Sequence, residues 1–167
     1  MSDASENKAQ DGIGPDRGKA PGLPRRVAAM VYDGFLVIPL IMGVVALATA
    51  VGVAVTGDPG DGDYSATLPP FLVQSLALSC VVGFYCYFWR LRGQTLGMQA
   101  WRLQLVGDSG DKVSLRQSLT RCAAAFLSFA PAGLGYVWCL IDSERLCWHD
   151  RLSGTHLRLV PKPSKKQ

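Results

Sequence analysis

Two long stretches of the chain are apolar on every side. Residues 27–55 contain one side chain that would carry charge, Asp33, and residues 71–89 contain none. Crossing about 30 Å of hydrocarbon takes roughly 20 helical residues at 1.5 Å per residue. A helix of a soluble domain shows a polar face, whereas a helix that is apolar all round is buried or faces lipid. The pattern therefore predicts two membrane-spanning helices, surrounded by a lipid bilayer.

A third apolar segment, residues 122–141, is interrupted in its middle by Pro131, Gly133 and Gly135. Proline and glycine end or bend helices. Two models of this segment remain open. Either it crosses the membrane as a third span, or a helix from about 114 to 129 enters, turns at the break and returns through a short helix from about 134 to 141.

Basic residues flank the two spans on one side only. Arg25 and Arg26 precede the first span, Arg90 and Arg92 follow the second, and the loop of residues 56–70 has aspartates but no Lys or Arg. Cytoplasmic loops carry the excess of Lys and Arg, which predicts a cytoplasmic N-terminus. A full third crossing would place the later basic residues outside, against this rule: Arg145, Arg151, Arg158, Lys162, Lys165 and Lys166.

Two short segments with alternating apolar and polar residues favour the returning hairpin. Residues 102–106 and 156–160 both have the period of two that is typical of a strand. A single strand is marginal without a partner, and these two pair only if they lie on the same side of the membrane. The expected fold is an all-α membrane protein. It is a small transmembrane helical bundle of two full spans plus a broken, re-entrant or third span, with a short cytoplasmic β-ribbon.

Composition divides the chain into three parts. Residues 1–24 mix polar residues, Gly and Pro without periodicity, which predicts a disordered cytoplasmic tail. Residues 25–160 form the membrane domain. Residues 161–167 form a basic tail, whose lysines would attract anionic lipid by about 1 kcal/mol each. The first apolar stretch is longer than the roughly 7–15 residues of a signal peptide, so we interpret it as a retained helix.

One acid and one base, Asp33 and Arg121, lie in the membrane segments. A charge near the bilayer centre costs roughly 2.5–3.5 kcal/mol, so such residues pair, face the protein interior or mark a transport path. We hypothesise that Asp33 pairs with Arg121. Two interpretations stay open: Asp33 fixes helix packing by hydrogen bonding while Arg121 snorkels to the interface, or Asp33 is an ion or proton site.

The other polar motifs indicate local structure rather than catalysis. Gly93 and Gly97 suit a tight turn, with Thr95 capping a short helix. Asp150 is expected to cap a turn or to pair with an arginine of the loop after the second span. Metal-capable side chains at 147–150 have only His156 nearby, so we predict no metal site and no cofactor.

The sequence gives little support to an enzyme, a nucleic-acid-binding protein or a protein with disulfide bonds. Paired carboxylates, a nucleophile–His–Asp order and zinc-helix motifs are missing from the sequence, so we do not expect an enzyme. A net charge of only +4 and no recognisable binding module argue against a nucleic-acid partner. The five cysteines form no CxxC pair and indicate buried apolar side chains.

Three segments in this order, residues 26–33, 93–97 and 149–155, resemble the RDD family of small bacterial membrane proteins, named for one arginine and two aspartates. The resemblance assigns these roles to Arg26, Asp33 and Asp150, and the Gly-x-Thr-x-Gly stretch to Gly93, Thr95 and Gly97. Family members often carry a basic residue just after this stretch, where this chain has Met98 and Gln99.

The resemblance implies a multi-pass protein of the bacterial inner membrane. Transport has been proposed for the family, so one expectation is a transporter or transporter component that uses Asp33. The alternative is a non-catalytic membrane scaffold or assembly factor that binds a partner protein. Two spans and a hairpin make a thin pore, so transport would require a homo-oligomer or a partner membrane protein.

Overall fold

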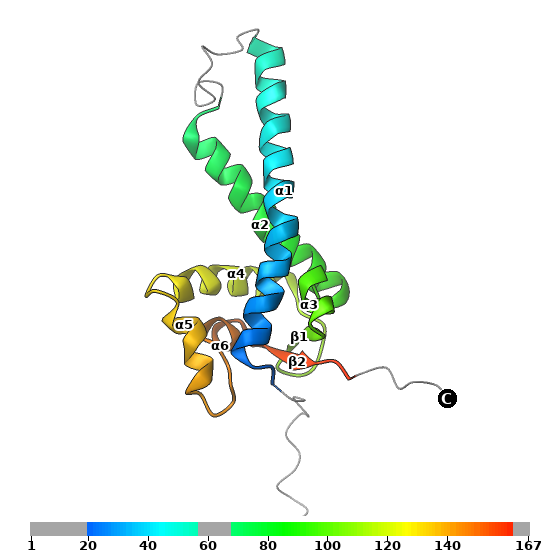
Figure 1. The fold of residues 1–167 in the computed structure, drawn as a ribbon, viewed down its shortest axis with the longest axis vertical. Coiled ribbons are helices and arrows are strands. Elements are labelled where there is room, and N and C mark those ends of the chain that lie inside the picture. The colour runs from blue at the N-terminus through cyan, green and yellow to red at the C-terminus, as the bar shows by residue number, and fades with distance from the viewer. Residues whose placement is uncertain (1–19, 57–67, 162–167) are drawn as a thin grey trace, which may run out of the picture.

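The computed structural model describes residues 20–56 and 68–161 (Figure 1). Helices α1 (Leu23–Thr56) and α2 (Pro70–Arg92) are both long and apolar enough to cross a membrane, which confirms the two predicted spans. Most of the predicted tail and the aspartates of the loop lie outside the described residues, as does the lysine-rich end. Helix α1 begins inside the range assigned to the tail.

The end of α2 is built as the sequence predicts. Gly93 adopts φ +66° and its N–H donates to the carbonyl of Trp89, at 3.0 Å. This left-handed cap satisfies a carbonyl that the helix leaves unpaired. Arg90 and Arg92 lie in the last turn, where positive charge favours the helix dipole. The short helix α3 (Leu96–Ala100) follows at once, with Thr95 as its N-cap.

Strands β1 (Leu103–Gly107) and β2 (Thr155–Leu159) form the predicted ribbon. They pair antiparallel, with Leu103 opposite Leu159 and Gly107 opposite Thr155. Strand β1 follows α2, and β2 follows the third apolar segment. Because paired strands lie on one side of a membrane, the segment between them enters and leaves on that side and does not make a complete crossing.

The third apolar segment forms α4 (Leu115–Phe129), α5 (Leu134–Val137) and a 3-10 turn (Trp138–Leu140). The helix axis bends by 109° between the two arms, as expected for a broken span or a re-entrant segment. Gly133 makes the turn at φ +81°, and Gly135 lies so close to Ser128 that an added Cβ would be 2.5 Å from the serine Cβ. The bend is therefore a tightly packed corner.

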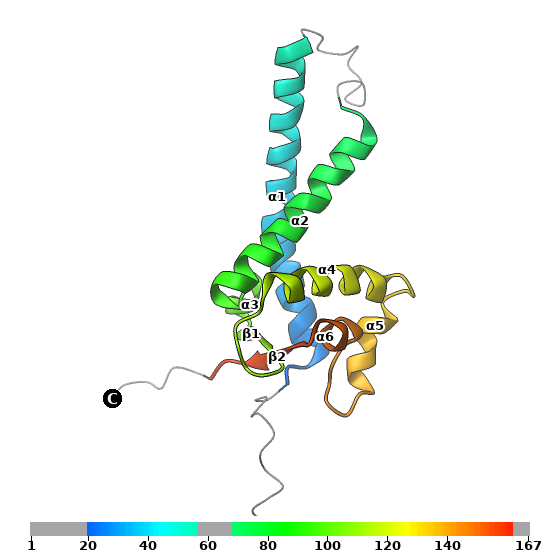
Figure 2. The ribbon, with the colours of Figure 1, turned by 180° about the vertical axis from the view of Figure 1, so that it is seen from behind.

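Helix α4 lies crosswise to α1 (Figures 1 and 2) and has its polar side turned inward. Ser118, Arg121 and Ser128 are buried, whereas Phe126 and Phe129 are more than half exposed. This is the reverse of a soluble amphipathic helix, whose apolar side faces the core. We infer that the outer side of α4 faces lipid.

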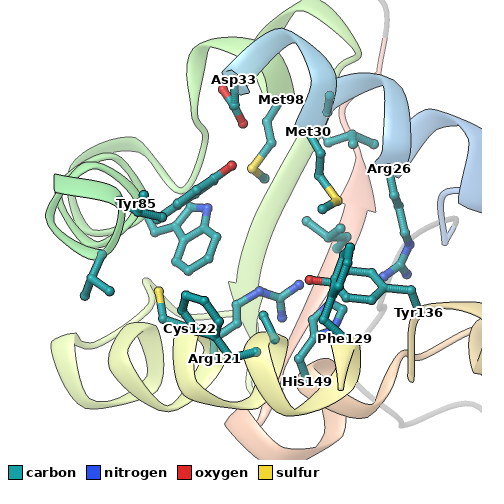
Figure 3. Close-up of a pocket in the computed structure, with 18 residues that line it drawn as sticks. Arg26, Met30, Asp33, Tyr85, Met98, Arg121, Cys122, Phe129, Tyr136 and His149 are labelled. Atoms are coloured by element: carbon teal, nitrogen blue, oxygen red, sulfur yellow. The ribbon is translucent and has the colours of Figure 1, made fainter. Parts of the chain in front are cut away.

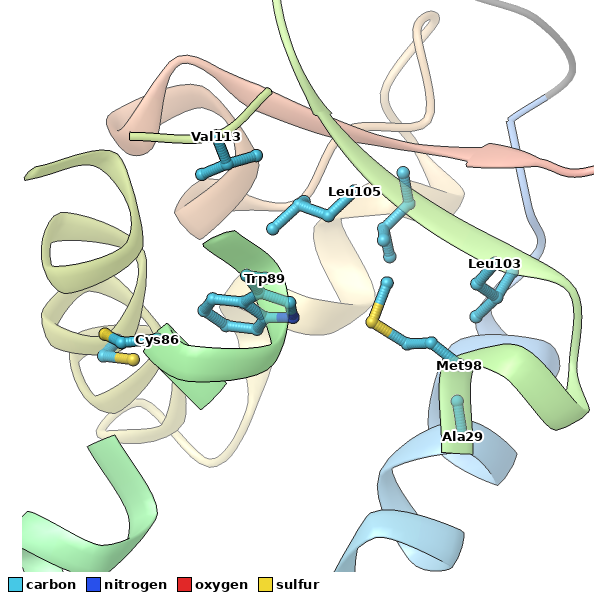
Figure 4. Packing of buried hydrophobic residues seen from close by; sticks show 9 residues of the cluster. Ala29, Cys86, Trp89, Met98, Leu103, Leu105 and Val113 are labelled. Atoms are coloured by element: carbon cyan, nitrogen blue, oxygen red, sulfur yellow. The ribbon is translucent and has the colours of Figure 1, made fainter. Parts of the chain in front are cut away.

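The hydrophobic core lies where α1, α2 and the ribbon meet, rather than between the spans. Trp89, Met98 and Leu105 pack together there with Ala29 of α1 (Figure 4). Beyond this base α1 and α2 diverge (Figures 1 and 2). In the most apolar stretch of each span only 6% of the residues are buried. Lipid or other helices must cover the remainder.

Candidate functional site

A buried ion cluster is centred on Asp150 in helix α6 (Trp148–Ser153). One carboxylate oxygen, Oδ2, accepts a hydrogen bond from Arg26 of α1 at 2.6 Å. The other, Oδ1, lies 2.5 Å from a guanidinium nitrogen of Arg121 of α4. The three side chains are at most 5% exposed. Asp150 thus joins three elements that are distant in the sequence.

Asp150 also caps its own helix, since its Oδ2 accepts from the backbone N–H of Cys147 at 3.0 Å. This capping role agrees with one of the two predicted alternatives. The arginines that it binds are not those of the loop after the second span, so that prediction is wrong. The partners come from the first turn of α1 and the middle of α4, which only folding brings together.

Arg26 donates to several acceptors besides Asp150. Its guanidinium reaches the carbonyls of Pro21 at 3.3 Å and Arg145 at 2.9 Å, and the sulfur of Cys147 at 3.3 Å. Arg121 donates to the hydroxyl of Thr155 at 2.7 Å. Hydrogen bonds of this number offset the cost of burying a guanidinium. The cluster therefore fixes the start of α1 to α6 and α4 to the ribbon.

The titration of the cluster follows from its charges. Burial alone would raise the pKa of Asp150, but the guanidiniums of Arg121 and Arg26 outweigh it and hold the pKa well below its usual range. His149 lies beside them, with Nε2 3.6 Å from Asp150 Oδ1. Burial and the positive charge of Arg121 lower its pKa to about 3, so His149 is neutral at physiological pH.

Asp33 is held separately from this cluster, by neutral donors. Its Oδ2 accepts from the hydroxyl of Thr95 at 2.6 Å and its Oδ1 from the backbone N–H of Gly97 at 2.8 Å. Thr95 in turn accepts from the N–H of Met98 at 3.2 Å, as the predicted cap requires. The predicted pair of Asp33 with Arg121 is wrong, because Arg121 binds Asp150.

Gly97 has a role other than the predicted turn. It lies within α3, where an added Cβ would be 2.2 Å from the carbonyl oxygen of Ala29 and 2.9 Å from the carboxyl carbon of Asp33. Only a residue without a side chain lets α3 approach α1 this closely. The close approach brings the N–H of Gly97 to the Asp33 carboxylate.

The model of one protein family matches residues 20–154, and its description is RDD family. The chain belongs to the RDD family. The match covers most of the chain and includes both aspartates and Arg26, as the sequence motifs indicated. Comparison with curated proteins and with solved structures gives no significant match to either. This RDD protein is thus shown to be a membrane protein with two span-length apolar helices.

A cavity of about 440 Å³ lies between α1, α2 and α4 (Figure 3), and two of the three RDD residues, Arg26 and Asp33, line it. Its walls are largely apolar, and Arg26, Asp33, Arg121 and His149 supply its polar part. In Figure 3 Asp33 lies on the α1 side near Met98, and Arg121 extends from α4 toward the middle of the space. Sites that bind small molecules are mostly apolar clefts of about 300–1,000 Å³ with a few polar groups.

Three of the predicted metal-capable side chains do come together. Ligand atoms of Cys147, His149 and Asp150 lie within 4.8 Å of one another. Two guanidiniums already neutralise the carboxylate, and burial and the nearby Asp150 charge raise the pKa of the Cys147 thiol. A metal ion would have to displace Arg26 from both the sulfur and the carboxylate. The arrangement suits an arginine clamp rather than a cation site.

Sequence reasoning missed two features of the site. Trp89 was not among the candidate residues, yet it is buried and lines the cavity, with the guanidinium of Arg121 5.6 Å from its ring centre. The neutral His149 was treated only as a ligand candidate. Its position next to Asp150 in the family motif was the available signal for membership of the cluster.

Proposed function

We propose that this RDD protein is a non-enzymatic component of a membrane transport assembly and that the cavity between α1, α2 and α4 is its binding site. The position and the lining of this cavity are the main support for the proposal. It lies at the base of two span-length helices and is lined by an arginine and an aspartate of the family motif, Arg26 and Asp33. A ligand there would contact the residues that hold the three helices together.

Transport would need further helices, because one chain offers little polar surface along its spans. Beyond Asp33 the described part of α1 carries no charged residue, and the hydroxyl of Thr49 donates to the carbonyl of Val45 in the same helix. In α2 the hydroxyl of Ser75 donates to Phe71 in the same way. The uncovered sides of the diverging spans supply the surface on which copies or partners would pack.

The orientation that we propose is a cytoplasmic N-terminus in the bacterial inner membrane. Arg25 and Arg26 at the start of α1 and Arg90 and Arg92 at the end of α2 lie at one end of the pair of spans. The ribbon and α6 follow on the same side. The positive-inside rule then assigns this side, with the cavity, to the cytoplasm.

Reconstitution tests the proposal. Purified in mild detergent and inserted in liposomes, the protein should form a stable oligomer and speed the movement of protons, sodium ions or a fluorescent amphipathic solute. The Asp33→Asn variant should stay folded and lower that rate if Asp33 takes part in transport. A folded oligomer that moves none of these solutes would contradict the proposal.

A scaffold that binds a partner protein is the second candidate, because Asp33 is fully occupied by Thr95 and Gly97. If Asp33 only fixes the packing of α1 and α3, the protein has no transport site there, and its two uncovered spans are surfaces for binding a partner protein. In that case Asp33→Asn should reduce the amount of assembled protein without a separate effect on flux. Co-purification of the wild-type chain with a larger complex, lost in the variant, would favour the scaffold.

A further inference from the structure

We infer that the cavity binds one anionic phospholipid of the surrounding bilayer, with the phosphate at Arg121 and Trp89 and an acyl chain between α2 and α4. This inference rests on the assignment of the cavity as the binding site. It names the ligand class, which the proposed function leaves open.

The charge of the ion cluster favours an anion. Two guanidiniums, of Arg26 and Arg121, face one carboxylate, of Asp150, and the neighbouring His149 is neutral. The other acid of the cavity, Asp33, has both oxygens bound to donors of the Thr95 and Gly97 region. Arg26, Arg121 and Asp150 together therefore carry one positive charge, and the negative charge of Asp33 lies apart from them on the α1 side of the cavity (Figure 3). In an apolar surrounding a counter-ion next to such a cluster is strongly favoured.

Donors without partners lie in the same wall. A guanidinium has five N–H donors, and the described contacts of Arg121 direct one nitrogen to Thr155 and one to Asp150, which leaves other N–H groups free. The indole nitrogen of Trp89 has no hydrogen-bond partner among the described residues either, and because its neighbours cover it, the indole must turn slightly for a ligand to reach it. Both groups only donate. A phosphate diester, which carries one negative charge and only accepts, complements them.

The apolar part of the cavity continues into a second groove of about 320 Å³ between α2 and α4. Val82, Cys122 and Phe126 line both spaces, and Leu78 and Leu119 extend the apolar wall. The outer side of α4 is apolar and exposed. A lipid can therefore enter sideways from the bilayer, with its chain along the groove and its headgroup at Arg121.

Tryptophan quenching by brominated lipids tests this inference on the full-length protein. In phosphatidylcholine vesicles, brominated phosphatidylglycerol should quench in a saturable way and more strongly than brominated phosphatidylcholine. The saturable part should disappear in Trp89→Phe, which identifies the reporter. Arg121→Gln should weaken the apparent affinity about tenfold, while Arg116→Gln, at an exposed position of the same helix, should match the wild type.

A second variant keeps every charge of the cluster, so that a loss of lipid binding can be distinguished from a loss of the fold. Ala125 lines the cavity, so Ala125→Leu should fill it and abolish saturable quenching, whereas Ala130→Leu at the exposed end of α4 should not. Equal quenching by the two lipids, or saturable quenching that survives Ala125→Leu, would overturn the inference. So would saturation with brominated stearic acid but not with the phospholipid. If the protein moves solutes in liposomes but binds no phospholipid in the cavity, only the lipid inference is contradicted. If it binds the phospholipid but moves no solute, only the transport proposal is contradicted.

Discussion

The two aspartates of the family motif hold the same helix bundle by different chemistry. Asp150 is balanced by two guanidiniums, from Arg26 and Arg121, and every member of the cluster is buried. Asp33 is equally buried but is held by a hydroxyl and a backbone N–H. The difference teaches that a buried carboxylate is accommodated either by charge or by preorganised neutral donors, with different costs when each is removed.

The largest effect is expected from Asp150→Asn. Removing this charge leaves two buried guanidiniums without a counter-ion, and breaking such a pair costs about 3–5 kcal/mol. The thermal unfolding midpoint in mild detergent measures the loss. Asp142→Asn is the matched control, since Arg151, the partner of Asp142, is half exposed, and it should change the midpoint far less. Equal shifts in the two variants would refute the ionic role of Asp150.

Gly97→Ala should have the next largest effect and tests the contact through which Asp33 is held. The new methyl group would overlap the carbonyl of Ala29, so α3 must move away from α1. Overpacking of this kind costs about 1–3 kcal/mol. Gly34→Ala is the control, because an added Cβ there meets nothing within 4 Å. If both variants unfold at the wild-type temperature, the close approach of α3 does not stabilise the fold.

Acid should weaken the ionic cluster through His149. Its pKa is about 3 in the fold and about 6.5 when unfolded, so the unfolded state binds the extra proton between these values. Stability is therefore complete above pH 7 and falls as the pH decreases, by about 2 kcal/mol from pH 7.5 to 5.0. Unfolding curves of the wild type across this range measure the slope.

His149→Gln should flatten that slope, because the glutamine does not titrate. The other histidine of the chain, His156, lies in β2 and serves as the control. His156→Gln should keep the acid dependence that His149 causes. An unchanged slope in His149→Gln would show that the histidine already carries a proton in the folded protein.

Asp33→Asn should have the smallest effect on stability, about 1 kcal/mol. The amide oxygen can still accept from Gly97, and the Thr95 hydroxyl can rotate to accept from the amide N–H. Chemical unfolding of this variant beside Asp150→Asn measures the contrast directly. A loss as large as that of Asp150→Asn would mean that the charge of Asp33 is needed for folding, and the comparison between the two aspartates would fail.

Local features of the site were predictable from the sequence. Gly93 ends α2 and Thr95 caps α3, as their order along the chain indicated. The alternating pattern also predicted the ribbon, although each strand is shifted by one residue. These features depend on neighbours in the sequence, so a short window of residues contains their physical cause.

Partners of the buried charges were not predictable in the same way. Arg26 and Asp150 are separated by 124 positions, and the sequence suggested Asp33 rather than Asp150 as the partner of Arg121. The crosswise direction of α4 decides that Arg121 reaches α6 instead of Asp33. Gly97 looked like a turn residue because the nearness of Ala29 on another helix leaves no local signal.

The sequence by itself determined that this RDD protein has two span-length apolar helices and a break in its third apolar segment. These follow from local apolarity, because each helix must meet the bilayer along its own length. Only the tertiary structure decided which acid binds which base, where the cavity opens and which side of α4 faces outward. Those outcomes depend on how closely the helices approach, and a single contact such as that of Gly97 with Ala29 sets this distance.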